Sequence, residues 1–242
     1  MHIIASITVQ SLVALLDQFT PSIFNVIPTV KEKRNFRKLC LLVTKIIEVG
    51  NKSFTQKGCA LLVDALLFGA EKHKGGRRYD ETTPYFIHCL EVLNFLIQMG
   101  VRDLEVFIAA IIHDTMEDCG ATKKELTSRF GENVYLIVKV LSKHPDKIME
   151  LFYWYNMRNE PNAYIRLKAI TIKFPDRAHS LRTLKGLPKA RRLRIKEETK
   201  KEFPELLEVF IDTFSELSEV EKNGLPANLA ESLHDLVLKR LL

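Results

Sequence analysis

The sequence predicts an all-α protein. Apolar residues recur at three- and four-residue spacing through almost the whole chain, which is the period of amphipathic helices. Only 10 Gly and 9 Pro interrupt this pattern, and no sustained alternation of apolar and polar residues supports a strand. With 242 residues, 46% of them hydrophobic, the chain can bury a sizeable core in one compact body with extensions.

Proline and glycine residues divide the first half of the chain. Pro21 and Pro28 are expected to split the first 50 residues into two or three helices. A Gly-rich basic loop at residues 74–78 precedes the helix that carries His88. Helices are therefore expected over residues 1 to about 50, about 56 to 73, from Pro84 to Gly100, and about 103 to 116.

The second half reads in the same way. Thr122 and Glu125 have the spacing of a capping box, which predicts a helix start, and a buried helix follows before Lys143. Pro175 should kink its helix or remove a hydrogen bond there. The remaining helices are expected over about 163 to 184, 189 to 215 and 227 to 242. We predict an N-terminal helical extension (1–55), a central domain (56–215) and a C-terminal amphipathic helix (216–242).

Charge and cysteine content restrict the partners and the compartment. The net charge of +6 and pI near 9.1 suit an anionic partner, which could be a phosphorylated small molecule, a nucleic acid or a membrane surface. The four cysteines form no CxxC pair, so a reducing cytoplasm is the simplest compartment. Asp17 breaks the apolar N-terminal stretch before it reaches the roughly 20 residues of a membrane span, so we expect neither a signal peptide nor a membrane partner.

The densest chemistry lies at the end of the apolar helix expected near 103–116. His113, Asp114, Glu117 and Asp118 fall within six residues, and on one helix these side chains would project toward one side. Buried polar groups must be satisfied by one another, by water or by an ion, so the cluster points to a metallohydrolase site.

More ligands must come from elsewhere in the chain. His88, on an apolar helix, and Asp176, beside Pro175, are the best-placed donors. An imidazole with carboxylates suits a divalent transition metal such as Mn²⁺ or Zn²⁺, whereas oxygen ligands alone would favour Mg²⁺ or Ca²⁺.

These residues resemble a known family, the HD-domain hydrolases of the RelA/SpoT type, which include the small stand-alone alarmone hydrolases. The resemblance spans about residues 56 to 210 and continues into Arg194-Ile195-x-x-Glu198-Thr199. It rests on several motifs in the family's order: Arg78, Pro84-Tyr85-x-x-His88, His113-Asp114-x-x-Glu117-Asp118, Phe130-Gly131, and Lys173-x-x-Asp176-Arg177-x-His179-x-x-Arg182-Thr183-Leu184.

The resemblance implies an HD-domain helical bundle that uses Mn²⁺, or another divalent metal, to remove the 3′-pyrophosphate from ppGpp and pppGpp. By position, the implied metal ligands are His88, His113, Asp114 and Asp176. The pair Glu117 and Asp118 matches the acidic residues that orient and activate the attacking water. The implied substrate-binding positions are Arg78, Lys173, Ser180, Arg182 and Thr183, where Lys173 and Arg182 are phosphate-binding or structural partners.

Two departures from the family pattern bear on the substrate. Ser180 stands where the family has a nucleotide-contacting asparagine, and Phe174-Pro175 stands where it has Leu-Ala. Another phosphorylated nucleotide, such as NADPH or ppApp, is therefore an alternative substrate.

Other functions make different demands on the chain. A nucleotide-sensing module without catalysis would have no need of Glu117 and Asp118. Nucleic-acid binding through the basic run 189–194 is disfavoured, because a solvated helix face explains that run as well. The N-terminal residues are candidates for packing, for gating the pocket or for homo-oligomer formation, and we expect a single activity because the chain ends before a synthetase domain could fit.

Overall fold

The computed structural model describes residues 30–142 and 155–241. In this part of the chain the regular elements are all helices, and there are no strands. Arg77 and Pro84 form an isolated β-bridge in the loop between the second and third described helices. The helices expected before Pro28 and the aromatic residues 152–154 lie outside the described residues. The all-α prediction is confirmed.

The elements are α2 (Val30–Ser53), α3 (Gln56–Lys72), α4 (Phe86–Gln98), α5 (Leu104–Ile112), α6 (Thr115–Cys119), α7 (Lys123–Phe130), α8 (Glu132–Leu141), α9 (Tyr155–Arg158), α10 (Ala163–Arg182), the 3-10 turn η2 (Leu184–Gly186), α11 (Lys189–Glu216) and α12 (Leu229–Leu241).

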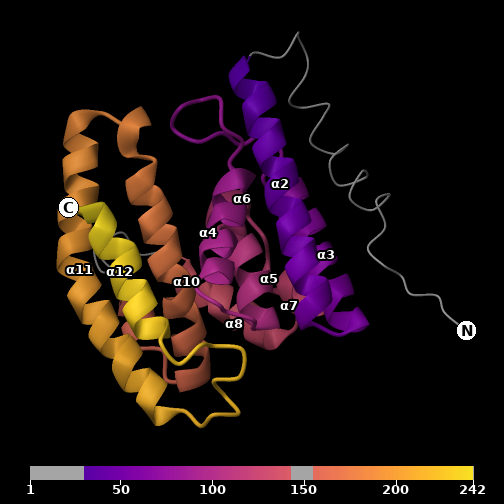
Figure 1. Ribbon diagram of the computed structural model, residues 1–242, viewed down its shortest axis with the longest axis vertical. Coiled ribbons are helices and arrows are strands. Elements are labelled where there is room, and N and C mark those ends of the chain that lie inside the picture. Colours follow the sequence, from indigo (N-terminus) through magenta and orange to yellow (C-terminus); the bar gives the residue numbers. More distant parts are fainter. Residues whose placement is uncertain (1–29, 143–154, 242) are drawn as a thin grey trace, which may run out of the picture.

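Two neighbouring groups of helices make up the bundle (Figure 1). α2 and α3 flank α4 and α5 on one side, while α11 and α12 cover α10 on the other. α10 joins the groups because it packs against α4, α5 and α8 as well as α11 and α12. No helix in the described part combines the length and the apolar character that a membrane crossing requires.

Most residues of α4 and α5 are buried in the apolar core. Every residue of α5 from Val106 to Ile112 is buried, so this part of the helix has no solvent face. Asp103 begins α5 by accepting a hydrogen bond from the Val106 N–H at 2.9 Å. Gly69 lets α3 approach closely, because a Cβ there would lie 2.6 Å from the Phe86 ring and 3.2 Å from the Ile111 carbonyl. A tightly packed, rigid support thus lies beneath the polar cluster that follows Ile112.

Most expected helices are present, with one correction that matters for function. The capping box of Thr122 and Glu125 is present, and α10 continues through Pro175. The single helix expected over about 103 to 116 is wrong, because α5 ends at Ile112 and α6 begins at Thr115. Thr115 donates its side-chain hydroxyl to the Ile112 carbonyl at 2.7 Å, and Asp114 has φ −93° and ψ 0°. The backbone therefore turns at His113 and Asp114.

A buried ionic cluster fixes α10 against the start of α5. The Lys168 side chain is 2% exposed, and its ammonium lies 2.8 Å from carboxylates of both Asp103 and Glu105. Tyr164 also contacts this ammonium and donates its hydroxyl to Glu105 at 2.9 Å. Burial raises the pKa of Glu105, but Lys168 lowers it more, so the pKa stays below its usual value. α10, which carries Asp176, is thus held in register with α5, which leads into His113 and Asp114.

We predict that Lys168→Met lowers the free energy of unfolding by about 3–5 kcal/mol, because it leaves two carboxylates without their cation. Since the folded pKa of Glu105 lies below the unfolded value of 4.5, this stabilisation is present above pH 4.5 and is lost as pH falls through the folded pKa. Urea denaturation at pH 7 and at lower pH measures both effects. Lys200→Met, on an exposed pair with Glu197, is the matched control and should change stability by less than about 0.5 kcal/mol. Equal effects of the two substitutions would contradict the prediction.

Candidate metal centre

Side chains from three helical regions meet at the end of α5. His88 projects from α4, His113 and Asp114 occupy the turn between α5 and α6, and Asp176 projects from α10. Both imidazoles are buried, with His88 2% and His113 3% exposed. Consecutive residues of a regular helix do not face each other, so the turn is what allows His113 and Asp114 to converge.

The imidazole of His113 presents one nitrogen to this junction. Its Nδ1 lies 2.9 Å from the Ala110 carbonyl, which can only accept, so Nδ1 carries a proton and Nε2 is the nitrogen that faces the junction. Nε2 lies 3.0 Å from Asp114 Oδ2 and 4.0 Å from Asp176 Oδ1. Within the described residues it makes no hydrogen bond of good geometry. This buried nitrogen therefore faces two carboxylates and can hold either a proton or a metal ion.

His88 is oriented in a similar way. Its Nδ1 lies 2.7 Å from Nδ1 of His179, and its Nε2 lies 3.2 Å from Asp176 Oδ1 and 3.6 Å from Asp114 Oδ2. Burial lowers the pKa of His179 to about 2, with smaller contributions from His88 and from the cations Arg78, Arg182 and Lys38, so His179 is neutral and can accept the proton of His88 Nδ1. Nε2 of His88 then has a free lone pair and is the second imidazole nitrogen directed at the carboxylates.

Both carboxylates are ionised and held from behind. Burial raises the pKa of Asp114 and of Asp176, but His113 near the first and Lys173 near the second lower it more, so both remain below their usual values. Tyr85 donates its hydroxyl to Asp114 Oδ2 at 2.8 Å, and Lys173 donates to Asp176 Oδ2 at 2.8 Å. Burial and Asp114 raise the pKa of Tyr85, which keeps its hydroxyl protonated as a donor.

This donor set fits a divalent cation. Ligand atoms of His88, His113 and Asp114 all lie within 4.8 Å of one another, and Asp176 adds a second carboxylate beside both imidazoles. Burial lowers the pKa of His113, yet Asp114 raises it well above its usual value, so a metal ion at Nε2 would take the place of a proton. Two imidazole nitrogens with carboxylate oxygens suit divalent transition metals, and His113 Nε2, which makes no hydrogen bond within the described residues, is the atom such an ion would satisfy.

The acidic pair lies one turn further along the chain. Glu117 and Asp118 belong to α6, where Glu117 is partly buried and Asp118 is exposed. Neither belongs to the group of side chains within metal-binding distance. Both residues therefore follow the turn on a separate helix instead of continuing one face of α5.

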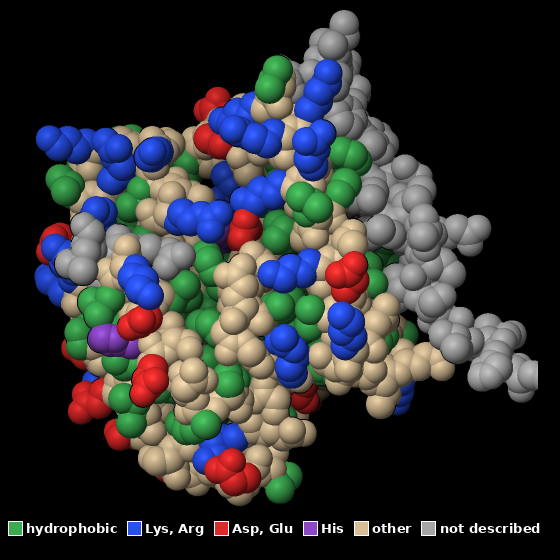
Figure 2. Space-filling model, in the orientation of Figure 1, with side chains coloured by type: hydrophobic (Ala, Val, Ile, Leu, Met, Phe, Trp, Pro, Cys, Tyr) green, Lys and Arg blue, Asp and Glu red, His purple; other side chains and the backbone are tan. Residues whose placement is uncertain are grey.

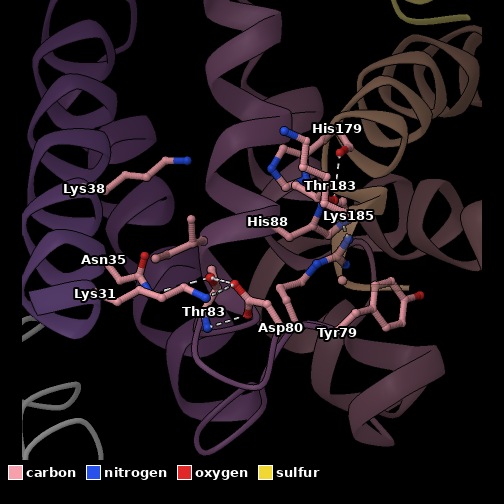
Figure 3. A pocket seen from close by; sticks show the side chains of 13 residues that line it. Lys31, Asn35, Lys38, Tyr79, Asp80, Thr83, His88, His179, Thr183 and Lys185 are labelled. Atoms are coloured by element: carbon pink, nitrogen blue, oxygen red, sulfur yellow. Dashed lines mark hydrogen bonds and ion pairs between the residues drawn. The ribbon is translucent and has the colours of Figure 1, made fainter. Parts of the chain in front are cut away.

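A cavity of about 430 Å³ opens beside His88 and His179 (Figure 3). Of the predicted substrate-binding residues, Arg78 and Thr183 line it, and Arg78 Nη2 donates to Thr183 Oγ1 at 3.2 Å. Its cationic side chains outnumber its carboxylates, and in Figure 2 Lys and Arg gather over this part of the face. Its lining comprises Lys31, Asn35, Lys38, Arg78, Tyr79, Asp80, Thr83, Ile87, His88, His179, Thr183, Lys185 and Gly186.

Three predicted substrate-binding residues lie elsewhere. Lys173 is buried and contacts Asp176, and Arg182 lies on the last turn of α10, 3.4 Å from Glu91. Ser180 is partly buried and is not part of the cavity lining. The sequence pattern places Lys173 near the metal centre but does not reveal that its ammonium is used by a ligand carboxylate.

Several side chains that support the site were not among the site residues predicted from the sequence. Tyr85 lies three residues before His88 within the same motif, and His179 lies three residues after Asp176, so helical spacing is a signal for both. The cavity residues Lys31, Asn35 and Lys38 carry no such signal, because only tertiary packing brings α2 to the site.

Comparisons with known proteins agree with the geometry. The HD domain family model matches residues 65–206. The guanosine-3′,5′-bis(diphosphate) 3′-pyrophosphohydrolase MESH1 of Xenopus tropicalis is 38% identical over 128 residues, which cover 52% of this chain and 70% of that protein. The guanosine-3′,5′-bis(diphosphate) 3′-pyrophosphohydrolase of Vibrio cholerae is 31% identical over 163 residues, covering 65% of this chain and 23% of that protein.

A solved structure matches as well. A metazoan ortholog of SpoT that hydrolyzes ppGpp superposes with a TM-score of 0.55 at 26% identity, covering 76% of this chain and 97% of that one. The chain thus spans most of the frog relative and about a quarter of the longer bacterial one. These matches confirm the resemblance to RelA/SpoT-type hydrolases, and the chain belongs to the HD-domain family.

Proposed function

We propose that the protein is a divalent-metal-dependent hydrolase that removes the 3′-pyrophosphate from ppGpp and pppGpp. The observation that carries this proposal is the convergence of His88, His113, Asp114 and Asp176 beside a basic cavity of about 430 Å³. The names of the frog and Vibrio relatives state this activity, and the SpoT ortholog hydrolyzes ppGpp.

The four converging side chains are the proposed metal ligands, and Mn²⁺ is the proposed ion, with another divalent metal as the alternative. When bound, such an ion lowers the pKa of water and polarises a phosphoryl oxygen. Tyr85, His179 and Lys173 keep the ligands in place through the contacts on their outer atoms.

Glu117 and Asp118 are the proposed proton-handling residues. Glu117 is partly buried and lies three residues after Asp114, whereas Asp118 is exposed and can pass a proton to solvent. In the reaction, the oxygen of water bonds to the phosphorus attached to O3′, and the bond between phosphorus and O3′ breaks. A carboxylate accepts the proton of the water, O3′ takes up a proton, and pyrophosphate leaves.

Arg78 and Thr183 are the proposed nucleotide contacts. Arg78 is 9% exposed, and its buried Nε makes no hydrogen bond within the described residues. A buried guanidinium with an unused donor favours an anionic acceptor in the cavity. We assign Lys173 to the support of Asp176, while substrate contacts by Ser180 and Arg182 remain predictions.

The expected setting is the cytoplasm. All four cysteines are free thiols, and Cys59 and Cys89 are buried in the core. The absence of disulfides among these four residues fits a reducing compartment. The phosphorylated nucleotide is the proposed partner.

The direct test is a panel of nucleotides incubated with Mn²⁺-loaded protein. We expect release of pyrophosphate from ppGpp and pppGpp, detected by chromatography, and loss of this activity on chelation. NADPH and ppApp belong in the panel because Ser180 departs from the family pattern. Cleavage of another nucleotide in place of ppGpp would redirect the assignment, and metal-loaded protein that cleaves none would refute it.

Two substitutions separate metal binding from proton transfer. Asp114→Asn should abolish both hydrolysis and calorimetrically measured Mn²⁺ binding, because it removes a charged ligand from the cluster. Glu117→Gln should retain Mn²⁺ binding while kcat falls by about 10²–10⁴, the usual contribution of a general base. A Glu117→Gln protein with unchanged kcat would contradict the role assigned to this carboxylate.

A further inference from the structure

α2 contributes to the cavity although it lies outside the family match. The helix covers Val30–Ser53, whereas the HD domain model begins at residue 65. Lys31, Asn35 and Lys38 of this helix nevertheless line the cavity that contains His88 (Figure 3). One wall of the site is therefore supplied by a helix that the shared family pattern does not include.

The helix is fixed in place by its apolar face. Leu39, Val43 and Ile46 are completely buried, and α2 packs against α3 and α4. Lys45 also donates to Asn94 of α4 at 2.6 Å. The lysines near its start are consequently presented to the cavity by a packed element.

Lys31 and Asn35 connect α2 to the loop that carries Arg78. Lys31 Nζ lies 3.1 Å from Asp80 Oδ2, and Asn35 donates to the Thr82 carbonyl at 3.2 Å. Asp80 accepts hydrogen bonds from the backbone N–H groups of Thr82 and Thr83 at 3.2 and 2.8 Å. The loop and α2 therefore form one continuous surface of the cavity. Asn35 and the hydrogen bonds of Asp80 hold the loop in addition to Lys31.

Lys38 lies further along the same wall. Its ammonium is 2.5 Å from Glu91, which is 4% exposed and is also 3.4 Å from Arg182. If Lys38 is replaced, Glu91 still has Arg182 as a cationic neighbour, so the replacement does not leave a buried carboxylate unpaired.

The turn η2 lies close to the loop of Arg78 and adds another cation to the cavity. Lys185 of η2 lies across the cavity from α2 (Figure 3), and Gly186 also lines the cavity. A Cβ at Gly186 would lie 3.1–3.2 Å from backbone atoms of Tyr79 and Asp80, so glycine permits this approach. The lining therefore holds four cations, namely Lys31, Lys38, Arg78 and Lys185, against the single carboxylate of Asp80.

We propose that Lys31 and Lys38 bind the phosphate groups of the substrate that are not cleaved, which makes α2 the element that selects a nucleotide phosphorylated at a second position. The inference rests on the proposed function, because the metal centre takes the scissile phosphate. A cavity of about 430 Å³ lies in the size range of small-ligand sites, roughly 300–1,000 Å³. Ammonium groups on its far wall act as point charges toward phosphate, and a nucleotide with one phosphorylated position would leave them unused.

The test compares ppGpp with guanosine 3′-diphosphate, which lacks the 5′ phosphates. In the double variant Lys31→Gln/Lys38→Gln, KM for ppGpp should rise by at least about tenfold, with kcat nearly unchanged. KM for guanosine 3′-diphosphate should stay the same, so the preference for ppGpp is lost. Lys33→Gln/Lys52→Gln, with the same charge change at exposed positions of α2, is the matched control and should behave as wild type.

Calorimetric titration of both nucleotides in the presence of Ca²⁺ provides a second readout that does not need turnover. If wild type cleaves no nucleotide but the double variant binds ppGpp at least about tenfold more weakly, the proposed reaction fails and the assignment of the lysines stands. Unchanged affinity for ppGpp, or equal loss for both nucleotides, overturns the inference while leaving a measured hydrolase activity intact. Lys31→Gln alone, at a side chain 42% exposed, replaces the double variant if the latter fails to fold.

Discussion

The structure depends on one electrostatic constraint, which is the placement of two buried imidazole nitrogens and two carboxylates around a common point. His88, His113, Asp114 and Asp176 direct these atoms toward one another from three helical regions. Such a cluster is unfavourable unless a cation compensates it. Tyr85, Lys173 and His179 satisfy the outer atoms, which leaves the inner atoms for the ion and gives the site its chemistry.

The fold meets this constraint by ending a largely buried helix at the right residue. α5 is apolar and buried from Val106 to Ile112, so its last turn lies within the core, and the turn at His113 and Asp114 aims both donors at α4 and α10. α10 then serves two purposes. It carries Asp176 at the metal centre, and through Lys168 it is tied to the start of α5, so the position of the ligands depends on a second buried charge cluster.

Sequence alone predicted most helices and the four converging side chains, because helical periodicity is a local property and the order of the motifs resembles that of a known family. It failed at the turn after Ile112, since apolar spacing does not show that Thr115 caps the preceding carbonyl. It also missed the cluster around Lys168 and the lysines of α2, because partners more than 40 residues apart are brought together only by packing. The family pattern is equally silent on α2, which precedes the matched residues.

Because the buried cluster is proposed to hold a divalent cation, thermal unfolding of metal-stripped protein should depend on the concentration of added Mn²⁺. A ligand that binds only the folded state stabilises it by about 2.7 kcal/mol at a hundredfold excess over Kd. We predict a melting temperature that rises steadily with Mn²⁺ concentration in wild type and stays constant when His113 is replaced by Ala. A wild-type melting temperature independent of Mn²⁺ would contradict the proposal that His88, His113, Asp114 and Asp176 hold this cation.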